Sequence, residues 1–241
     1  MVTFPRTLSL IRHAQSAGNV ANDAALLAGL PELDLALRDM DVPLSELGEI
    51  QAAALGEWFA ELARAPSVVL CSPYKRAVDT AAIAMKAGGT DAPVQLDERL
   101  REREFGVLDR LTKVGIEARF PEQAAARAFI GKFFHRPPGG ESWTDVAARV
   151  RGVMTDLRRG YPDQDVVIIT HQAVIMLFRY VLDELTEAEL IDLDSREQIA
   201  NTAVTSYAST DGFLRLVEFN DSSHLPAAET TDASDRSVAP R

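Results

Sequence analysis

Short apolar segments alternate with amphipathic segments along most of this chain, and this alternation limits the folds that it can adopt. The apolar runs at 7–11, 67–71 and 165–170 are typical of buried strands, and the last is the strongest strand signal. Helical periodicity follows, most clearly at 46–62 and 143–159. Strands that alternate with helices in this way form βαβ units with helices on both faces of the sheet. We therefore predict an α/β fold of three layers, α/β/α, with a mostly parallel central sheet.

The rest of the chain indicates a single domain with one insertion. We expect this domain to span residues 1–220, with a helical cap insertion at about 107–136 that has no strand partner. Two alternating runs within 202–219 flank Asp211-Gly212 and predict a hairpin. Large apolar residues are almost absent after that point, so the tail at 221–241 is expected to be disordered.

Charged side chains follow several of the predicted strands. Arg12 and His13 come directly after the first strand, and His171 directly after the strongest one. The segment 72–76 opens a predicted helix at Ser72-Pro73, and 100–106 follows a short strand. Ligands of such sheets bind beyond the carboxyl ends of the strands. We therefore expect two histidines, several arginines and a glutamate to gather at one edge of the sheet.

This set of side chains is suited to phosphoryl transfer. A neutral imidazole can attack phosphorus and form a covalent intermediate, and arginine pairs with two phosphate oxygens at once. A carboxylic acid can protonate the leaving group, and its carboxylate can then activate water. The sequence offers such a set in His13, Arg12, Arg76, His171 and a glutamate of the 102–104 segment. These side chains can carry out the reaction without a metal or cofactor.

Six segments resemble the histidine phosphatase superfamily, the phosphoglycerate mutase-like family, in the order and spacing that the family shows. They cover about residues 7–210 and are Leu10–Asn19, Asp41–Gly48, Cys71–Ala81, Leu100–Gly106, Gly139–Ser142 and Val167–His171. The resemblance implies that His13 is the phosphorylated nucleophile and that Arg12, Arg76 and His171 form the phosphate pocket.

The resemblance also selects a proton donor and further substrate contacts. The acidic residue of the family stands four positions before the glycine, which is Glu102 here rather than Glu104. Asn19 and Ser16 match positions that contact the transferred phosphate.

Two residues depart from the pattern of the family. Ala14 replaces the glycine that usually follows the nucleophile, which alanine can do only where the local φ is negative. Gln172 replaces the glycine after the second histidine and is expected to place an amide near the substrate.

These observations predict a phosphatase that hydrolyses a small phosphomonoester through a phosphohistidine. Two alternatives stay open. One is phosphoryl transfer of the phosphoglycerate mutase type, and the other is a catalytically silent module that binds a phosphorylated ligand. No cluster has the spacing of metal ligands, and no P-loop or Gly-x-Ser-x-Gly elbow is present in the sequence. We expect a cytoplasmic, metal-independent enzyme, because no secretion signal or membrane span is evident and the chain has one cysteine.

The net charge of −11 argues against nucleic acid and membrane partners and leaves a small phosphorylated substrate as the expected one. The charge is uneven: nine basic residues face five acidic ones between Arg99 and Arg136. Since exposed charges are screened beyond about 8–10 Å, this local excess predicts a positive pocket on an acidic protein. A homodimer stays open.

Overall fold

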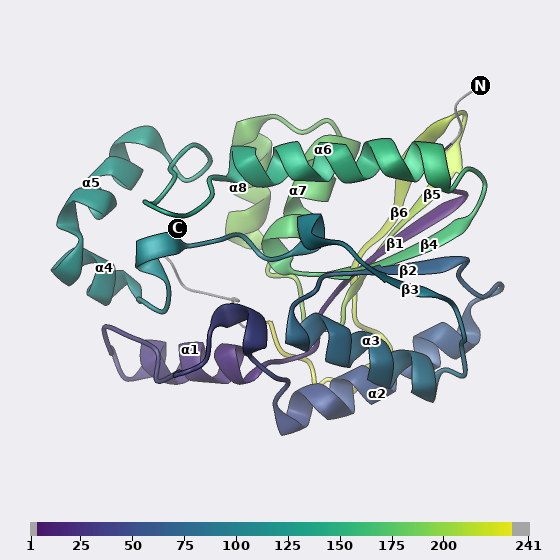
Figure 1. Cartoon of the computed structure of the whole chain (residues 1–241), viewed down its shortest axis with the longest axis horizontal. Coiled ribbons are helices and arrows are strands. Elements are labelled where there is room, and N and C mark those ends of the chain that lie inside the picture. Colours follow the sequence, from purple (N-terminus) through teal and green to yellow (C-terminus); the bar gives the residue numbers. More distant parts are fainter. Residues whose placement is uncertain (1–3, 233–241) are drawn as a thin grey trace.

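A six-stranded mixed sheet forms the centre of the chain, for which the computed structural model describes residues 4–232 (Figure 1). The strand order is β3-β2-β4-β1-β5-β6. The pairs β1–β4, β4–β2 and β2–β3 are parallel, whereas β5 pairs antiparallel with β1 and β6. The strands are β1 (Thr7–Arg12), β2 (Val68–Cys71), β3 (Val94–Leu96), β4 (Asp165–Thr170), β5 (Val204–Thr210) and β6 (Phe213–Asp221). The prediction of a mostly parallel sheet is therefore confirmed.

Helices cover both faces of this sheet, as predicted (Figure 1). Helices α6 and α7 lie on one face, and α2 and α3 on the other, while α4 and α5 lie beyond the end of the sheet. The helices are α1 (Ala17–Leu27), α2 (Glu46–Glu61), α3 (Lys75–Ala87), α4 (Lys113–Arg119), α5 (Pro121–Ile130), α6 (Trp143–Gly160), α7 (Gln172–Leu182) and α8 (Glu187–Arg196). None of the helices in the described residues is long and apolar enough to cross a membrane.

The alternation of side chains along β4 explains why its sequence is a continuous apolar run. Val166 and Ile168 face the core beneath α6 and α7, whereas Val167 and Ile169 face the core beneath α2 and α3. A strand that is buried on both faces has no solvent-exposed position for a polar residue. This is the physical basis of the strongest strand signal in the sequence.

The helix starts follow local capping chemistry. Ser45 and Ser142 cap α2 and α6, because each hydroxyl accepts a hydrogen bond from a backbone N–H of the first turn. The helix expected to open at Pro73 begins at Lys75 instead, with Tyr74 at the N-cap. Helix α8 was not expected, since its apolar stripe is short, although Thr186 and Glu189 form a capping box at its start.

The predicted hairpin is present, and the segment after it differs in part from the expected disordered tail. Asp211 and Gly212 both adopt positive φ, as the turn of a tight hairpin requires. Residues 222–232 are described and form hydrogen bonds with the body of the protein through Glu229 and Thr231. The positions 233–241 lie outside the described residues.

Candidate active site

The two motif histidines lie side by side at the carboxyl edge of the sheet. Strands β1 and β4 are neighbours in register, with Arg12 opposite Thr170, so that the next residue of each strand is His13 and His171. The backbone N–H of His13 donates to the oxygen of Thr170 at 2.9 Å. Both imidazoles are fully buried, and their ring centroids are 5.0 Å apart. The parallel register of two strands therefore brings together residues that are far apart in the sequence.

The contacts of His13 fix which ring nitrogen can attack a substrate. Nδ1 lies 2.7 Å from the backbone oxygen of Ala14, which can only accept, so Nδ1 carries the proton. Nε2 is then the nitrogen with the lone pair, and Nε of Arg76 donates to it at 3.3 Å. The side-chain amide of Asn201 donates to the backbone oxygen of His13 at 2.9 Å. This bond fixes the backbone of the nucleophile loop, which begins at His13.

Ala14 fits its position although the family has glycine there. It does not belong to the residues with positive φ in the described chain, so its Cβ causes no backbone strain. Its N–H donates to Oγ1 of Thr80 at 3.0 Å, and this hydroxyl donates to the backbone oxygen of Arg76. The nucleophile loop is thus tied to the helix that carries Arg76.

Arg76 reaches the histidine pair from α3 and also binds an acidic residue. Its side chain is 3% exposed, and Nη1 donates to the backbone oxygen of Asp39 at 2.7 Å and to Oδ1 of Asp39 at 3.0 Å. Asp39 lies in a short 3-10 turn (Asp39–Asp41) between α1 and α2. Its carboxylate sits where an anionic ligand of Arg76 would bind.

His171 is held by β2 and by the residue that caps α3. Its Nε2 lies 2.8 Å from Oγ of Ser72, and the ring of Tyr74 packs edge-on with a centroid distance of 5.2 Å. The backbone N–H of Ser72 donates to Ile169 at the end of β4. The parallel pairing of β2 with β4 thus sets the orientation of the second imidazole.

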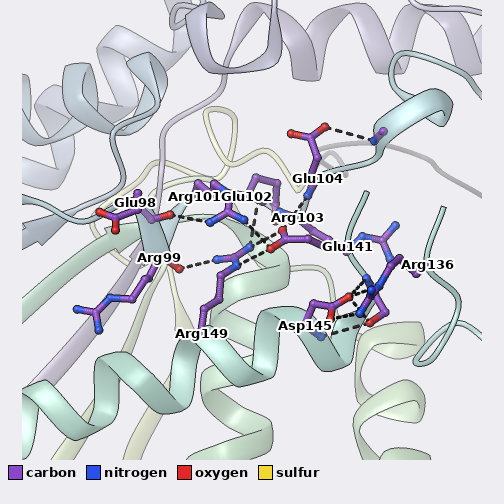
Figure 2. A network of polar contacts seen from close by, with 12 residues as sticks. Glu98, Arg99, Arg101, Glu102, Arg103, Glu104, Arg136, Glu141, Asp145 and Arg149 are labelled. Carbon is purple, nitrogen blue, oxygen red and sulfur yellow. Dashed lines mark hydrogen bonds and ion pairs between the residues drawn. The ribbon is translucent and has the colours of Figure 1, made fainter. Parts of the chain in front are cut away.

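A buried ion-pair network holds the segment that carries Glu102 (Figure 2). Arg149 of α6 pairs with Glu141 and donates to the backbone oxygens of Arg99 and Glu102. Oγ1 of Thr170 donates to the backbone oxygen of Leu100 at 2.6 Å. Since Thr170 precedes His171, this bond ties the glutamate segment to the edge of the sheet that carries the histidines.

The two candidate glutamates have different surroundings. Glu104 accepts hydrogen bonds from the backbone N–H groups of Phe105 and Gly106, so its carboxylate caps the turn that follows. Glu102 is 2% exposed and accepts from the backbone N–H of Arg103 at 2.7 Å. The turn itself requires glycine, because Gly106 has φ +55° and a Cβ there would lie 2.1 Å from the oxygen of Pro138.

The remaining residues predicted for the site lie at helix starts or under the sheet edge. Ser16 and Asn19 form a reciprocal capping box at the start of α1, so both are engaged in holding that helix. Arg12 is fully buried and donates to the backbone oxygen of Ile199. Gln172 opens α7 beside His171 and donates to Oε1 of Gln198 at 3.0 Å.

The last described residues reach back to the nucleophile loop. Oγ1 of Thr231 donates to Oδ1 of Asn201 at 2.9 Å, and Nε2 of Gln51 donates to Oγ1 of Thr231 and to the backbone oxygen of Glu229. Gln51 in turn accepts from the backbone N–H of Gln15 at 2.8 Å. Asn201 contacts His13 as described above, so this tail segment supports the loop from two sides.

Four residues of this arrangement were not singled out as site residues from the sequence: Asp39, Thr80, Asn201 and Ser72, the last only as part of the segment 72–76. Each is a small polar residue, and its relevance depends on a partner far away in the chain. Asp39 and Asn201 lie in irregular segments that no periodicity marks. Only the placement of Ser72 at a predicted strand end was a signal for its role.

Neither the cysteine near the site nor a metal ion is needed to explain its chemistry. Cys71 ends β2, and burial raises the pKa of its thiol to about 12, so that it stays protonated at neutral pH. Within residues 4–232, no group of three or more His, Cys, Asp or Glu side chains is arranged to hold a metal ion.

Comparison with known proteins gives one consistent family. The model of the histidine phosphatase superfamily (branch 1) matches residues 8–222. A 2,3-bisphosphoglycerate-dependent phosphoglycerate mutase of Methylobacterium radiotolerans is 34% identical over 216 residues, which are 86% of this chain and 96% of the mutase. A glucosyl-3-phosphoglycerate phosphatase of Mycobacterium tuberculosis is 33% identical over 192 residues, 76% of this chain and 78% of that protein. The solved mycobacterial glucosyl-3-phosphoglycerate phosphatase in complex with VO3 has a TM-score of 0.70 at 29% identity, over 90% of this chain and all of that one.

Proposed function

Because the chain belongs to branch 1 of the histidine phosphatase superfamily, we propose that it is a phosphatase that hydrolyses a small phosphomonoester through a phosphohistidine at His13. The single observation that carries this proposal is the state of the His13 ring. Its Nδ1 proton is held by a backbone oxygen, so Nε2 presents a lone pair next to the guanidinium of Arg76. A nucleophile beside a phosphate-binding cation is what the first chemical step requires.

In the first step, Nε2 of His13 attacks phosphorus as the ester P–O bond breaks. The leaving alkoxide takes the proton of Glu102, which acts as a general acid. Arg12, Arg76 and His171 bind the three equatorial oxygens, on which negative charge spreads in the transition state. Ser16, Asn19 and Gln172 are proposed as further substrate contacts. Asp39 has to release Arg76 before the phosphate can bind.

In the second step, the carboxylate of Glu102 accepts a proton from water while the water oxygen attacks phosphorus. The bond between phosphorus and Nε2 breaks, inorganic phosphate leaves, and His13 and Glu102 return to their starting states. Glu102 is favoured over Glu104 for both proton transfers, because the carboxylate of Glu104 is occupied by two backbone N–H groups.

Replacing His13 tests this proposal directly. We expect His13→Ala to reduce turnover of p-nitrophenyl phosphate by at least about 10⁴-fold, since the covalent step is lost. Wild type quenched during turnover of a ³²P-labelled ester should carry acid-labile label, and the variant should carry none. His135→Ala is the control for the label and should keep it, because His135 is buried against Gln123 of the cap insertion and is not among the contacts of His13. Turnover or label that survives in His13→Ala would overturn the proposal.

A second candidate is phosphoryl transfer of the mutase type, which the 34% identical relative supports. It shares the first step but requires the phosphoenzyme to resist water. Adding a phosphoglycerate together with its bisphosphate separates the two reactions. Isomerisation that is faster than release of inorganic phosphate would favour the mutase.

A further inference from the structure

A cavity of about 430 Å³ lies between the cap insertion and α8, and neither His13 nor His171 lines it. Figure 1 shows α4 and α5 beyond the end of the sheet, on the side of α8. Leu108, Ile116 and Ile191 form apolar parts of the wall, while Arg103 and Arg127 form cationic parts. The cavity thus combines a surface for hydrocarbon with a place for an anion.

Each guanidinium group in this wall has one buried nitrogen without a hydrogen-bond partner in the part of the chain that the structure describes. Arg103 is 4% exposed and stacks over the ring of Phe105, with its carbon Cζ 4.4 Å from the ring centroid. Among the described residues, the buried Nη1 atoms of Arg103 and Arg127 have no hydrogen-bond partner. A buried cationic N–H group without an acceptor destabilises a fold, so its presence at a cavity points to a ligand.

The carboxylates of the cavity already have lysine partners. Asp194 pairs with Lys132, and Glu117 lies 3.7 Å from Lys113. Two carboxylates and two lysines balance in charge, which leaves the guanidinium groups of Arg103 and Arg127 in excess.

Burial lowers the pKa of both arginines, and the charge of Arg127 adds repulsion at Arg103. Burial, and then the charge of Arg127, lower the pKa of Arg103 to about 10, although Glu102, Glu141 and Asp194 act in the opposite direction. Burial, followed by Arg127 and Arg103, lowers the pKa of His135 as well, which favours the neutral form of this imidazole. An anion between the arginines would remove this repulsion.

We propose that the cavity is a second anion-binding site, in which Arg103 and Arg127 hold a carboxylate or phosphate group of a small organic molecule. Both groups offer paired oxygens that match the planar fork of a guanidinium. The hydrocarbon part of the ligand packs against the apolar wall. The anion is either a second charged group of the substrate or a separate small molecule. The proposal of an anion site does not depend on the proposed function. The proposal that the substrate supplies the anion rests on the proposed function.

Amide NMR of the whole protein, titrated with inorganic phosphate, tests the site without reference to turnover. About 50 mM phosphate saturates any site of millimolar Kd. We expect saturable shifts at the amides of residues 124–135 in wild type and their loss in Arg127→Met. Arg159→Met is the matched control, since it removes the same charge from an exposed position of α6 and should keep the shifts.

The same spectra keep the two proposals apart. Shifts near His13 and His171 report the catalytic pocket, so their absence would count against the proposed function and not against the second site. If the amides of 124–135 do not shift in wild type, or shift equally in Arg127→Met, the second site is excluded. A melting curve of each variant confirms that it is folded.

A pair of esters distinguishes the two sources of the anion. We expect the ratio of kcat/KM for 4-(carboxymethyl)phenyl phosphate over phenyl phosphate to fall about tenfold in Arg127→Met if the substrate itself supplies the second anion. An unchanged ratio, together with the lost amide shifts, would assign the site to a separate anion. Arg159→Met should leave the ratio unchanged in either case.

Discussion

Asp39 shows how a single residue can set the affinity of the proposed site for phosphate. Its carboxylate and its backbone oxygen both accept from Arg76, the guanidinium that also donates to the proposed nucleophile. A phosphate has to displace these bonds before it can bind Arg76. In the absence of phosphate, the carboxylate of Asp39 is thus the anion that pairs with Arg76.

We expect Asp39→Ala to tighten inhibition by inorganic phosphate roughly fivefold, because removal of one charged competitor is worth about 1 kcal/mol at this position, where the Asp39 side chain is 16% exposed. The inhibition constant against p-nitrophenyl phosphate measures the effect. Asp41→Ala is the control, since Asp41 lies in the same turn but pairs with the exposed Arg38. Equal or weaker inhibition in Asp39→Ala would show that the carboxylate does not compete.

At the scale of elements, α6 positions the segment of Glu102 through one arginine. Arg149 is 9% exposed in its side chain, pairs with Glu141, and binds two backbone oxygens of that segment. Arg101 binds the same glutamate, but a third of its side chain is exposed. The two arginines therefore form a matched pair for mutation.

We expect Arg149→Met to lower the free energy of unfolding by about 3–5 kcal/mol, because it removes the more deeply buried of the two arginines that pair with Glu141. The kcat for p-nitrophenyl phosphate should fall roughly 10- to 100-fold as Glu102 shifts, with a smaller change in KM. Arg101→Ala should lower the free energy of unfolding by less than about 1 kcal/mol. Urea unfolding and steady-state kinetics measure both effects, and an unchanged kcat in Arg149→Met would refute the positioning role.

The elements that could be predicted from the sequence are those specified by local chemistry. The strand β4 is specified by its own apolar run, and the starts of α2 and α6 are specified by the capping serines Ser45 and Ser142. In each case a few neighbouring residues are sufficient. The meeting of His13 and His171 also follows, because parallel strands end at a shared edge. The contact of Asp39 with Arg76 could not be predicted in this way, because it depends on the course of the irregular segment between α1 and α2. The cavity at Arg103 and Arg127 likewise exists only where the cap insertion packs near α8.

At the scale of the whole molecule, the segment 222–232 after β6 links α2 to the residues before β5 through Thr231. Thr231 binds both Gln51 of α2 and Asn201 before β5, and each of these contacts the nucleophile loop. The basic segment 99–136 contributes Arg103 and Arg127 to the cavity beside α8, and the positive pocket expected from the uneven charge stays a prediction.

We expect Thr231→Val to reduce the free energy of unfolding by about 1–2 kcal/mol and to lower kcat, because it removes the hydroxyl that accepts from Gln51 and donates to Asn201. Thr230→Val is the control, since that hydroxyl bonds only locally to Pro226 among the described residues and should change stability by less than about 0.5 kcal/mol. Urea unfolding and turnover of p-nitrophenyl phosphate test both variants. Equal effects of the two substitutions would contradict a specific role of Thr231.

The strand that carries the proposed nucleophile is synthesised well before the two strands with which it pairs. Among the described residues, strand β1 pairs with β4 and β5 alone, and these begin at Asp165 and Val204. At a synthesis rate of about 5–20 residues per second, β1 waits on the order of ten seconds or longer for its neighbours to be made. Until then its apolar side chains have no sheet to join. A nascent chain stalled before β4 should therefore depend on chaperones, and the proposed phosphoryl transfer needs β4 in place, because His171 follows that strand.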